Sequence, residues 1–215
     1  MRKQACHLVE FALRSVCDEG GFGYLDERGQ VDRSRGRELW INARMTHCAA
    51  IGAMLGHVGA CSALKHGVRA LSELFVDQAA GGWYTAIGWD GQPTDDTKAA
   101  YAHAFVILAA SSAVATGGIG DEANALLRTA LDISTKYFWD ETAGMVVEEW
   151  DRGFTTLSDY RGINANMHTV EAYLAAADAL AAQDPSSLEP VTLRLRALRI
   201  LDRVINRDAR ANNWR

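Results

Sequence analysis

The chain has 215 residues and a formal net charge of −5, and 48% of its residues are hydrophobic. This composition is that of a globular protein of one or two domains. The acidic balance argues against a nucleic-acid partner, because nucleic-acid-binding domains carry a basic surface. A run of arginines at 194–207 fits the solvated face of a last helix. No apolar run approaches the roughly 18 residues that cross a membrane.

The cysteines fit a reducing compartment. Cys6, Cys17, Cys48 and Cys61 form no C-x-x-C pair and no spacing typical of metal ligands. We expect them to be buried as small apolar side chains. Charged residues also interrupt the apolar N-terminal stretch that a signal peptide needs. The sequence therefore predicts a cytoplasmic protein with no metal site and no membrane contact.

Helical periodicity dominates the chain. Apolar residues recur at spacings of three and four, as Leu64, Val68, Leu71 and Phe75 do, and such spacing marks one face of an α-helix. The last helical segment begins with SSLE at 186–189, which predicts a capping box. The pattern predicts seven helices, over 3–17, 37–56, 60–76, 96–116, 121–138, 164–182 and 188–207.

Glycine- and aromatic-rich stretches separate the helix pairs. They begin at residue 20 (GGFGYLD), residue 81 (GGWYT) and residue 144 (GMVVEEW). Each predicts a short β-hairpin or an extended loop. The repeating unit is therefore a hairpin-like loop followed by two helices.

A unit of this kind cannot bury its own apolar face, so neighbouring units must stack around a shared core. Helices in antiparallel pairs, with their loops gathered at one end, predict an all-α fold: an α/α toroid with its pocket at the loop end. We expect residues 1–215 to form a single partial domain, about the N-terminal half of that toroid. The expectation that the C-terminal half is missing rests on the repeat count, about three and a half units where a closed toroid of the common kind has about six, and on the last residues, ARANNWR, which lack a capping composition.

The first candidate site lies in the second predicted helix. Trp40, Arg44 and His47 are spaced by four and three residues, which places them on one helical stripe. Aromatic faces pack on the C–H surfaces of sugars and a guanidinium holds oxygens, so the stripe suits a hydroxyl-rich ligand, neutral or anionic. The alternative is a buried arginine satisfied by a carboxylate, with His47 in a packed interior.

The second candidate site lies in the sixth predicted helix. Asn164, His168 and Glu171 share a stripe by the same spacing. A histidine can move protons at neutral pH, and a neighbouring carboxylate would orient its ring. The alternative is an exposed polar face, or a helix start capped by Asn164 or Asn166.

A third cluster lies in the fourth predicted helix. Tyr101 and Phe105 share a stripe, and His103 points to the opposite side. Plain core packing is the competing interpretation for these aromatic residues. The acidic pairs at 95–96 and 148–149 leave open a glycoside hydrolase, which needs two opposed carboxylates. Adjacent acids at a hairpin or helix start are, however, typical of caps and solvated loops.

Three stretches resemble the N-acylglucosamine 2-epimerase superfamily. They are 37–47 (RELWINARMTH), 81–84 (GGWY) and 160–172 (YRGINANMHTVEA). Within the superfamily the chain looks most like the bacterial aldose–ketose isomerases, a group that includes mannose isomerase and sulfoquinovose isomerase. The resemblance runs along essentially the whole chain and implies an (α/α)₆ barrel.

The resemblance also implies a cofactor-free reaction on a reducing monosaccharide. In such enzymes the sugar ring opens, a histidine removes the proton at C2, and a cis-enediol forms. Return of the proton to C1 gives a ketose, and return to C2 gives an epimer. His168 would be a catalytic residue that acts in ring opening or on the O1 and O2 protons, with Glu171 lying behind it. The substrate-binding residues would be Arg44, Trp40, Tyr101 and Asn164.

The chain departs from the family in length. Further catalytic histidines of the family, including the base that moves the proton between C1 and C2, fall in the half that we expect to be missing. A sugar 2-epimerase and an inactive carbohydrate-binding half-barrel therefore stay open as alternatives to the isomerase. Uncovered apolar helix faces would also favour self-association of such a half-barrel.

Overall fold

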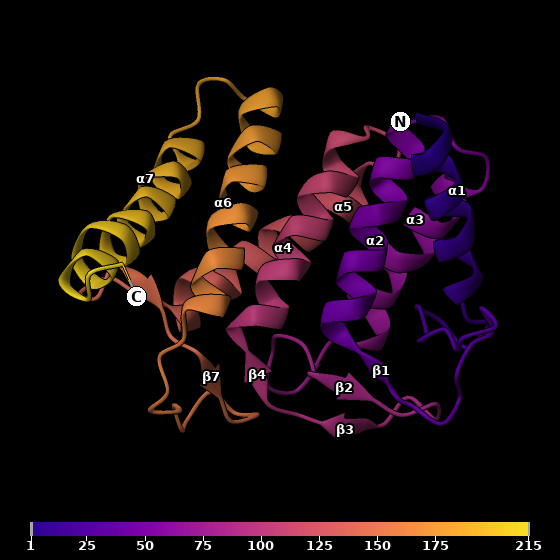
Figure 1. Cartoon of the computed structure of the whole chain (residues 1–215), viewed down its shortest axis with the longest axis horizontal. Helices are drawn as coiled ribbons and strands as arrows, with labels where there is room; N and C mark the ends of the chain where they lie inside the picture. The colour runs from indigo at the N-terminus through magenta and orange to yellow at the C-terminus, as the bar shows by residue number, and fades with distance from the viewer. Residues whose placement is uncertain (1, 215) are drawn as a thin grey trace.

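The computed structural model describes residues 2–214, which form an open arc of helices with short strands at one end (Figure 1). Short 3₁₀ or π turns extend four of the helices, over Leu13–Ser15, Ala70–Leu74, Ser134–Phe138 and Asp202–Ala209. The seven helices in this part of the chain are α1 (Arg2–Ala12), α2 (Leu39–Met54), α3 (Ala60–Arg69), α4 (Ala100–Ala115), α5 (Asp121–Ile133), α6 (Ile163–Gln183) and α7 (Glu189–Leu201).

The strands are two or three residues long and pair antiparallel. They form the sheets β1-β2-β3, β4-β7 and β5-β6. All of them lie at the end where α2, α4 and α6 begin (Figure 1). The strands are β1 (Arg37–Glu38), β2 (Ala86–Ile87), β3 (Pro93–Asp95), β4 (Lys98–Ala99), β5 (Trp139–Asp140), β6 (Met145–Val146) and β7 (Glu149–Trp150).

The seven predicted helices and the hairpin-like stretches between them are confirmed, with two corrections. The fourth helix begins at Ala100 rather than at residue 96, because residues 98–99 pair with β7 as strand β4. The predicted capping box of α7 is wrong. The Ser186 hydroxyl donates to Asp184 instead, and Leu188, which has no capping side chain, precedes the helix.

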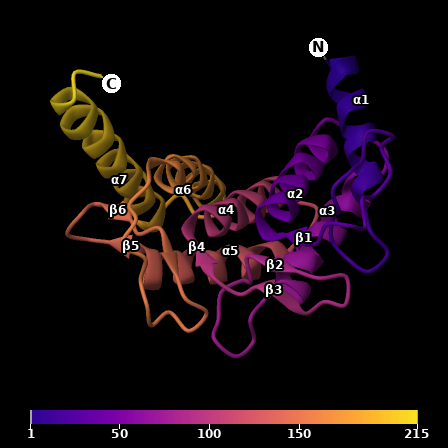
Figure 2. The same cartoon turned by 60° about the horizontal axis from the view of Figure 1, so that its bottom comes forward.

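The helices form two layers. Figure 2 shows α2, α4 and α6 side by side on the concave side of the arc, with α3 and α5 behind them and α1 and α7 at its two ends. Alanines such as Ala43, Ala104, Ala109 and Ala172 are buried where the inner helices meet. Their small side chains let the helix backbones approach closely.

A buried asparagine fastens α2 and α6 to the hairpin stretch that precedes each helix. Asn42 is the fourth residue of α2: its side-chain oxygen accepts from the Phe22 N–H at 2.6 Å, and its amide donates to the Phe22 carbonyl at 3.1 Å. Asn166, the fourth residue of α6, makes the same pair of bonds to Val146 at 2.8 and 3.1 Å. Each clamp spans 20 residues of chain. The clamps hold the strand end of each repeat in a fixed place beside its inner helix.

A histidine takes the same place in α4. His103 is the fourth residue of this helix; its Nδ1 donates to the Ala99 carbonyl at 2.8 Å, and its Nε2 accepts from the Trp83 N–H at 3.3 Å. The ring packs against Trp83 and Phe138 and is 2% exposed. Burial lowers the pKa of His103 to about 3, so the imidazole is neutral in the folded chain. As the sequence indicated, His103 points away from Tyr101.

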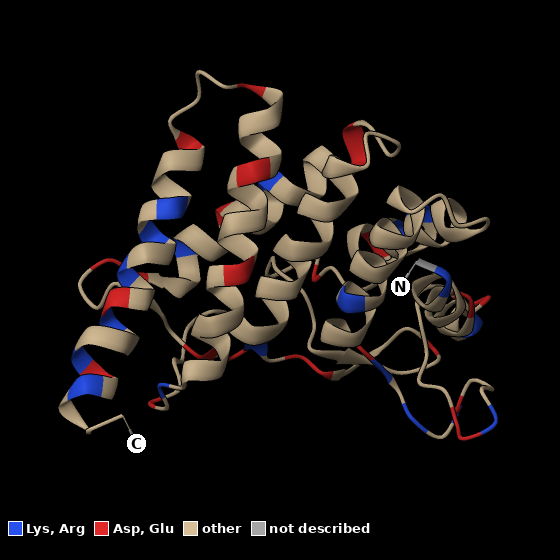
Figure 3. Ribbon diagram, turned by 45° about the horizontal axis from the view of Figure 1, so that its top comes forward, with Lys and Arg blue, Asp and Glu red and all other residues tan. Residues whose placement is uncertain are grey.

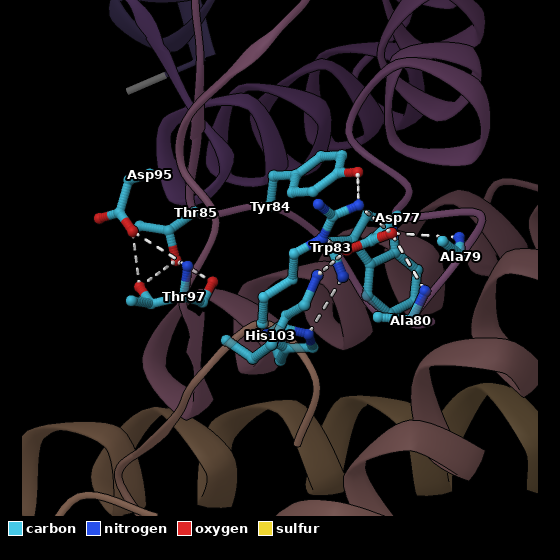
Figure 4. Close-up of polar contacts among 11 residues, drawn as sticks. Asp77, Ala79, Ala80, Trp83, Tyr84, Thr85, Asp95, Thr97 and His103 are labelled. Carbon is cyan, nitrogen blue, oxygen red and sulfur yellow. Dashed lines mark hydrogen bonds and ion pairs between the residues drawn. The ribbon is translucent and has the colours of Figure 1, made fainter. Parts of the chain in front are cut away.

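A buried carboxylate ties three loop segments together at the strand end (Figure 4). Asp77 is fully buried; it accepts from Lys98 Nζ at 3.1 Å, from Arg152 Nε at 2.8 Å and from the backbone N–H groups of residues 79–80. Burial alone would raise the pKa of Asp77, but these donors outweigh it and hold the pKa well below its usual range. Arg152 also donates to the Tyr84 hydroxyl at 3.1 Å.

Two expectations about the surface have different outcomes. Cys17 is buried, but Cys48 and Cys61 are exposed, so the expectation that all cysteines are buried is wrong for these two, which face outward from their helices. Figure 3 shows basic residues along α7. Of its arginines, Arg194 and Arg199 are exposed, as expected, whereas Arg196 is partly buried against Trp139. Arg194 pairs with Asp178 at 2.7 Å. Within residues 2–214 no helix is both long enough and apolar enough to span a membrane.

Candidate active site

The candidate residues occupy equivalent positions of the three inner helices. Because α2, α4 and α6 begin next to the strands in the same way, their second, sixth and ninth residues lie at matching depths on one helical stripe. These positions hold Trp40, Arg44 and His47 in α2, Tyr101, Phe105 and Leu108 in α4, and Asn164, His168 and Glu171 in α6.

An aromatic row links the three helices. The Trp40 and Tyr101 ring centroids are 6.0 Å apart, and Tyr101 meets Phe105 edge to face at 5.1 Å. The His168 ring lies 5.3 Å from Tyr101 and 4.6 Å from Phe105. The structure therefore brings Trp40, Tyr101 and His168 to one surface. Flat, partly exposed rings of this kind suit the C–H face of a sugar.

Arg44 lies over this row with free hydrogen-bonding capacity. Its guanidinium carbon is 5.0 Å from the Phe105 ring centroid and 5.8 Å from that of Trp40. The side chain is exposed, and no carboxylate of residues 2–214 pairs with it. The alternative of a buried arginine satisfied by a carboxylate is therefore not what the structure has. The guanidinium donors are available to oxygens of a ligand.

His168 is oriented by a carboxylate one helical turn away. Its Nδ1 lies 3.0 Å from Glu171 Oε2. A carboxylate only accepts, so Nδ1 carries the proton and, in the neutral ring, Nε2 is the basic nitrogen. The His168 side chain is 18% exposed, enough for a ligand to reach it, whereas Glu171 is 52% exposed. This pair can take up and return a proton at a fixed place.

Asn164 and Asn166 have separate roles. Asn164 is exposed at the start of α6, on the face that carries His168. Asn166 is buried, and its side chain forms hydrogen bonds with the backbone N–H and carbonyl of Val146. Neither side chain caps α6 through a hydrogen bond, so the alternative of a capped helix start is wrong.

His47 lies one turn below Arg44. Its Nδ1 is 2.7 Å from the Ser112 hydroxyl of α4, a contact that sequence reasoning missed. Burial lowers the pKa of His47; the charge of Glu171 raises it in part and that of Arg44 lowers it. The effect of Glu171 and Arg44 on one imidazole indicates that charged groups of α2 and α6 face a common space.

Sequence reasoning also missed Glu38 and Tyr24, at the strand end of the inner helices. Glu38 accepts a hydrogen bond from the Trp40 indole. Burial, followed by the hydrogen bond and the charge of Glu38, raises the pKa of Tyr24 to about 12, and the Arg35 guanidinium stacks on the Tyr24 ring at 3.4 Å. No sequence spacing links Tyr24 to Trp40, because the hairpin loop folds back between them.

Two of the acidic residues considered for a glycoside hydrolase, Asp95 and Glu148, bind local backbone or hydroxyl groups. Asp95 accepts from the Thr97 hydroxyl and N–H, at 2.8 and 3.0 Å. Glu148 accepts from the Gly162 N–H at 3.1 Å. Asp95 thus stabilises its own turn, and Glu148 holds the residue before α6. Glu149 lies near both acids: burial first, and then the charges of Asp95 and Glu148, raises its pKa.

Comparisons with known proteins agree with this arrangement. The profile of the N-acylglucosamine 2-epimerase family matches residues 20–215. D-mannose isomerase from Thermobifida fusca is 40% identical over 212 residues, which are 99% of this chain and 50% of that protein. D-mannose isomerase from Pseudomonas cannabina is 40% identical over 196 residues, or 91% of this chain and 44% of that protein. The chain thus spans about half the length of the curated relatives it matches.

Solved structures extend the comparison to the fold. A crystal structure of D-mannose isomerase superposes with a TM-score of 0.83 at 27% identity, over 98% of this chain and 54% of that chain. Cellobiose 2-epimerase from Bacillus thermoamylovorans superposes with a TM-score of 0.80 at 20% identity, over 94% of this chain and 54% of its own, which shows the fold alone. The predicted all-α fold of the α/α-barrel kind is confirmed. The chain belongs to the N-acylglucosamine 2-epimerase family.

Proposed function

We propose that the protein to which this chain belongs is a cofactor-independent aldose–ketose isomerase that converts a hexose such as mannose into fructose. One observation carries the proposal: His168, oriented by Glu171, lies against the Tyr101 and Phe105 rings on the face that also carries Arg44. A proton carrier, an aromatic platform and a guanidinium together suit a sugar whose protons move between C1 and C2. The relatives named D-mannose isomerase support the same substrate class.

The reaction needs only proton transfers. After the ring opens, a base takes the C2 proton, and the electron pair of that C–H bond forms the C1–C2 double bond while the carbonyl oxygen O1 gains a proton. In the resulting cis-enediol, C1 takes up a proton and O2 loses one, which leaves the ketone at C2. His168 Nε2 would carry a proton in ring opening or at O1 and O2, a contribution of roughly 10²- to 10⁴-fold in rate.

The other inner-face residues would hold the sugar. Arg44 would donate hydrogen bonds to substrate oxygens, and Trp40 and Tyr101 would pack on its C–H faces. Asn164 would contribute an amide at the open end of α6. Glu171 would act through His168, because it fixes which ring nitrogen is basic.

The test is proton NMR of mannose in D₂O with the full-length barrel that contains this chain, because the base that moves the proton between C1 and C2 is expected outside the part of the family barrel that the chain spans. Loss of the C2 proton signal together with fructose signals would support an isomerase, whereas appearance of glucose would indicate a 2-epimerase. His168→Asn should abolish exchange, and His7→Asn, at an exposed position of α1, should not. Binding of mannose without exchange, lost in Arg44→Ala, would indicate a carbohydrate-binding half-barrel. A folded, full-length barrel that neither binds mannose nor exchanges its C2 proton would overturn the proposal.

A further inference from the structure

His47 is a partly buried histidine of the inner helices to which the chemistry above gives no task. It shares the stripe of Trp40 and Arg44, at the ninth position of α2. Ser112 of α4, which holds its Nδ1, lies seven residues beyond Phe105 on the same stripe of that helix. The residue therefore belongs to the face where the sugar is expected, one turn deeper than Arg44.

The hydrogen bonds of Ser112 fix the tautomer of His47. The Ser112 hydroxyl donates its proton to the Leu108 carbonyl at 2.9 Å, so its oxygen can only accept from the histidine. Nδ1 of His47 must then carry the hydrogen, 2.7 Å from Ser112 Oγ. Because burial lowers the pKa of His47, the ring stays neutral and Nε2 keeps its lone pair.

Nε2 has no donor among the residues that the structure describes, yet it is not sealed from solvent. The charged groups that act on the ring are Glu171 of α6 and Arg44, one turn above on α2. A hydroxyl group placed between Arg44 and His47 could both accept and donate a hydrogen bond: its oxygen would accept from the guanidinium, and its O–H would donate to Nε2. A sulfonate or carboxylate would accept from Arg44 but would leave Nε2 without a donor, because it has no proton to donate.

We propose that His47 is a specificity-determining residue that accepts a hydrogen bond from a substrate hydroxyl through Nε2. This inference rests on the proposed function. The competing interpretation is that His47 only joins α2 to α4 through Ser112. The two interpretations differ in which ring nitrogen matters.

Two substitutions separate the ring nitrogens. His47→Asn places an amide N–H near Nδ1 and keeps the bond to Ser112, but removes Nε2; His47→Gln reaches the Nε2 position and gives up the bond to Ser112. For the mannose dissociation constant measured by calorimetry, we expect His47→Asn to weaken binding about tenfold and His47→Gln to weaken it less. A purely structural role predicts the reverse order, which would overturn the inference.

A panel of monodeoxy mannoses identifies the contact. One deoxy sugar should bind the parent chain more weakly than mannose does, and this loss should be smaller in His47→Asn, in which the hydroxyl of mannose contacts only Arg44. Equal losses in both proteins would overturn the inference while leaving the proposed function standing. A parent chain that binds none of the sugars would overturn both.

A measurement on the unsubstituted chain covers the case in which a variant does not fold. Nitrogen-15 NMR of the imidazole should show a protonated Nδ1 and a bare Nε2 for His47, and the Nε2 resonance should move when mannose is added. A protonated Nε2, or a resonance that mannose leaves in place, would overturn the inference.

Discussion

The buried imidazole of His103 should make the stability of this chain depend on pH. Its pKa is about 3 in the folded state, against about 6.5 for an unperturbed histidine in the unfolded chain. Between these values the unfolded chain binds a proton at His103 and the folded chain does not, so acidification favours unfolding. The stability is fully present above about pH 6.5 and is lost as the pH falls toward 3.

The magnitude follows from the pKa difference. One pKa unit corresponds to about 1.4 kcal/mol, and His103 is only 2% exposed, so solvent screens little of the effect. Between pH 7 and pH 4.5 the linkage amounts to about 2.5 kcal/mol, or roughly 5–10 °C in Tm for a domain of this size. Asparagine fills the same clamp position in α2 and α6, so His103→Asn should remove the titration and keep the hydrogen bonds.

The assay is thermal unfolding followed by circular dichroism from pH 4.5 to pH 7. The Tm of the parent chain should fall about 5–10 °C more across this range than that of His103→Asn. The variant should be less stable at pH 7, because it loses the ring contacts with Trp83 and Phe138. The test is therefore the change of Tm with pH and not the Tm at one pH. His7→Asn should keep the parent slope. Equal slopes for parent and His103→Asn would refute the reasoning.

Three further outcomes are expected. Asn166→Ala should lower the free energy of unfolding in urea by about 2–5 kcal/mol, because it leaves the buried N–H and carbonyl of Val146 unpaired. The exposed Asn164→Ala should change it by less than about 0.5 kcal/mol, and equal changes would contradict the clamp. Asp77→Asn should lower the free energy of unfolding by about 3–5 kcal/mol at pH 7, because the buried Lys98 loses its charged partner. Since the pKa of Asp77 is held below its usual range, the parent should also lose stability below about pH 4 more steeply than this variant, and Asp178→Asn, which removes an exposed partner, serves as its control. Finally, the chain should self-associate in light scattering through the exposed Leu195 and Leu198 of α7, and lysine at both positions should reduce the measured mass; a monomeric parent would contradict this.

The sequence predicted what repeats along one helix and missed what depends on packing. The stripe of Trp40 and Arg44 was readable because helical neighbours are fixed by spacing alone. The Asp77–Arg152 bond joins residues 75 positions apart, and only the folded arrangement of the loops brings them together. The His47–Ser112 bond, across 65 positions, has the same origin. The site could therefore be predicted helix by helix, whereas the contacts between helices could not.

Because of the clamps at the fourth helical positions, the residues that stabilise each repeat differ from those that line the candidate site. The hydrogen bonds to the hairpin stretches come from the fourth position of each inner helix, which is Asn42, His103 or Asn166. The second, sixth and ninth positions of the same helices make none of these bonds. The sixth position of these helices differs from repeat to repeat, Arg44 in α2, Phe105 in α4 and His168 in α6, while each repeat keeps a clamp at the fourth position. Substitutions intended to change the sugar specificity should therefore be made on this face, because they leave the three clamp residues unchanged.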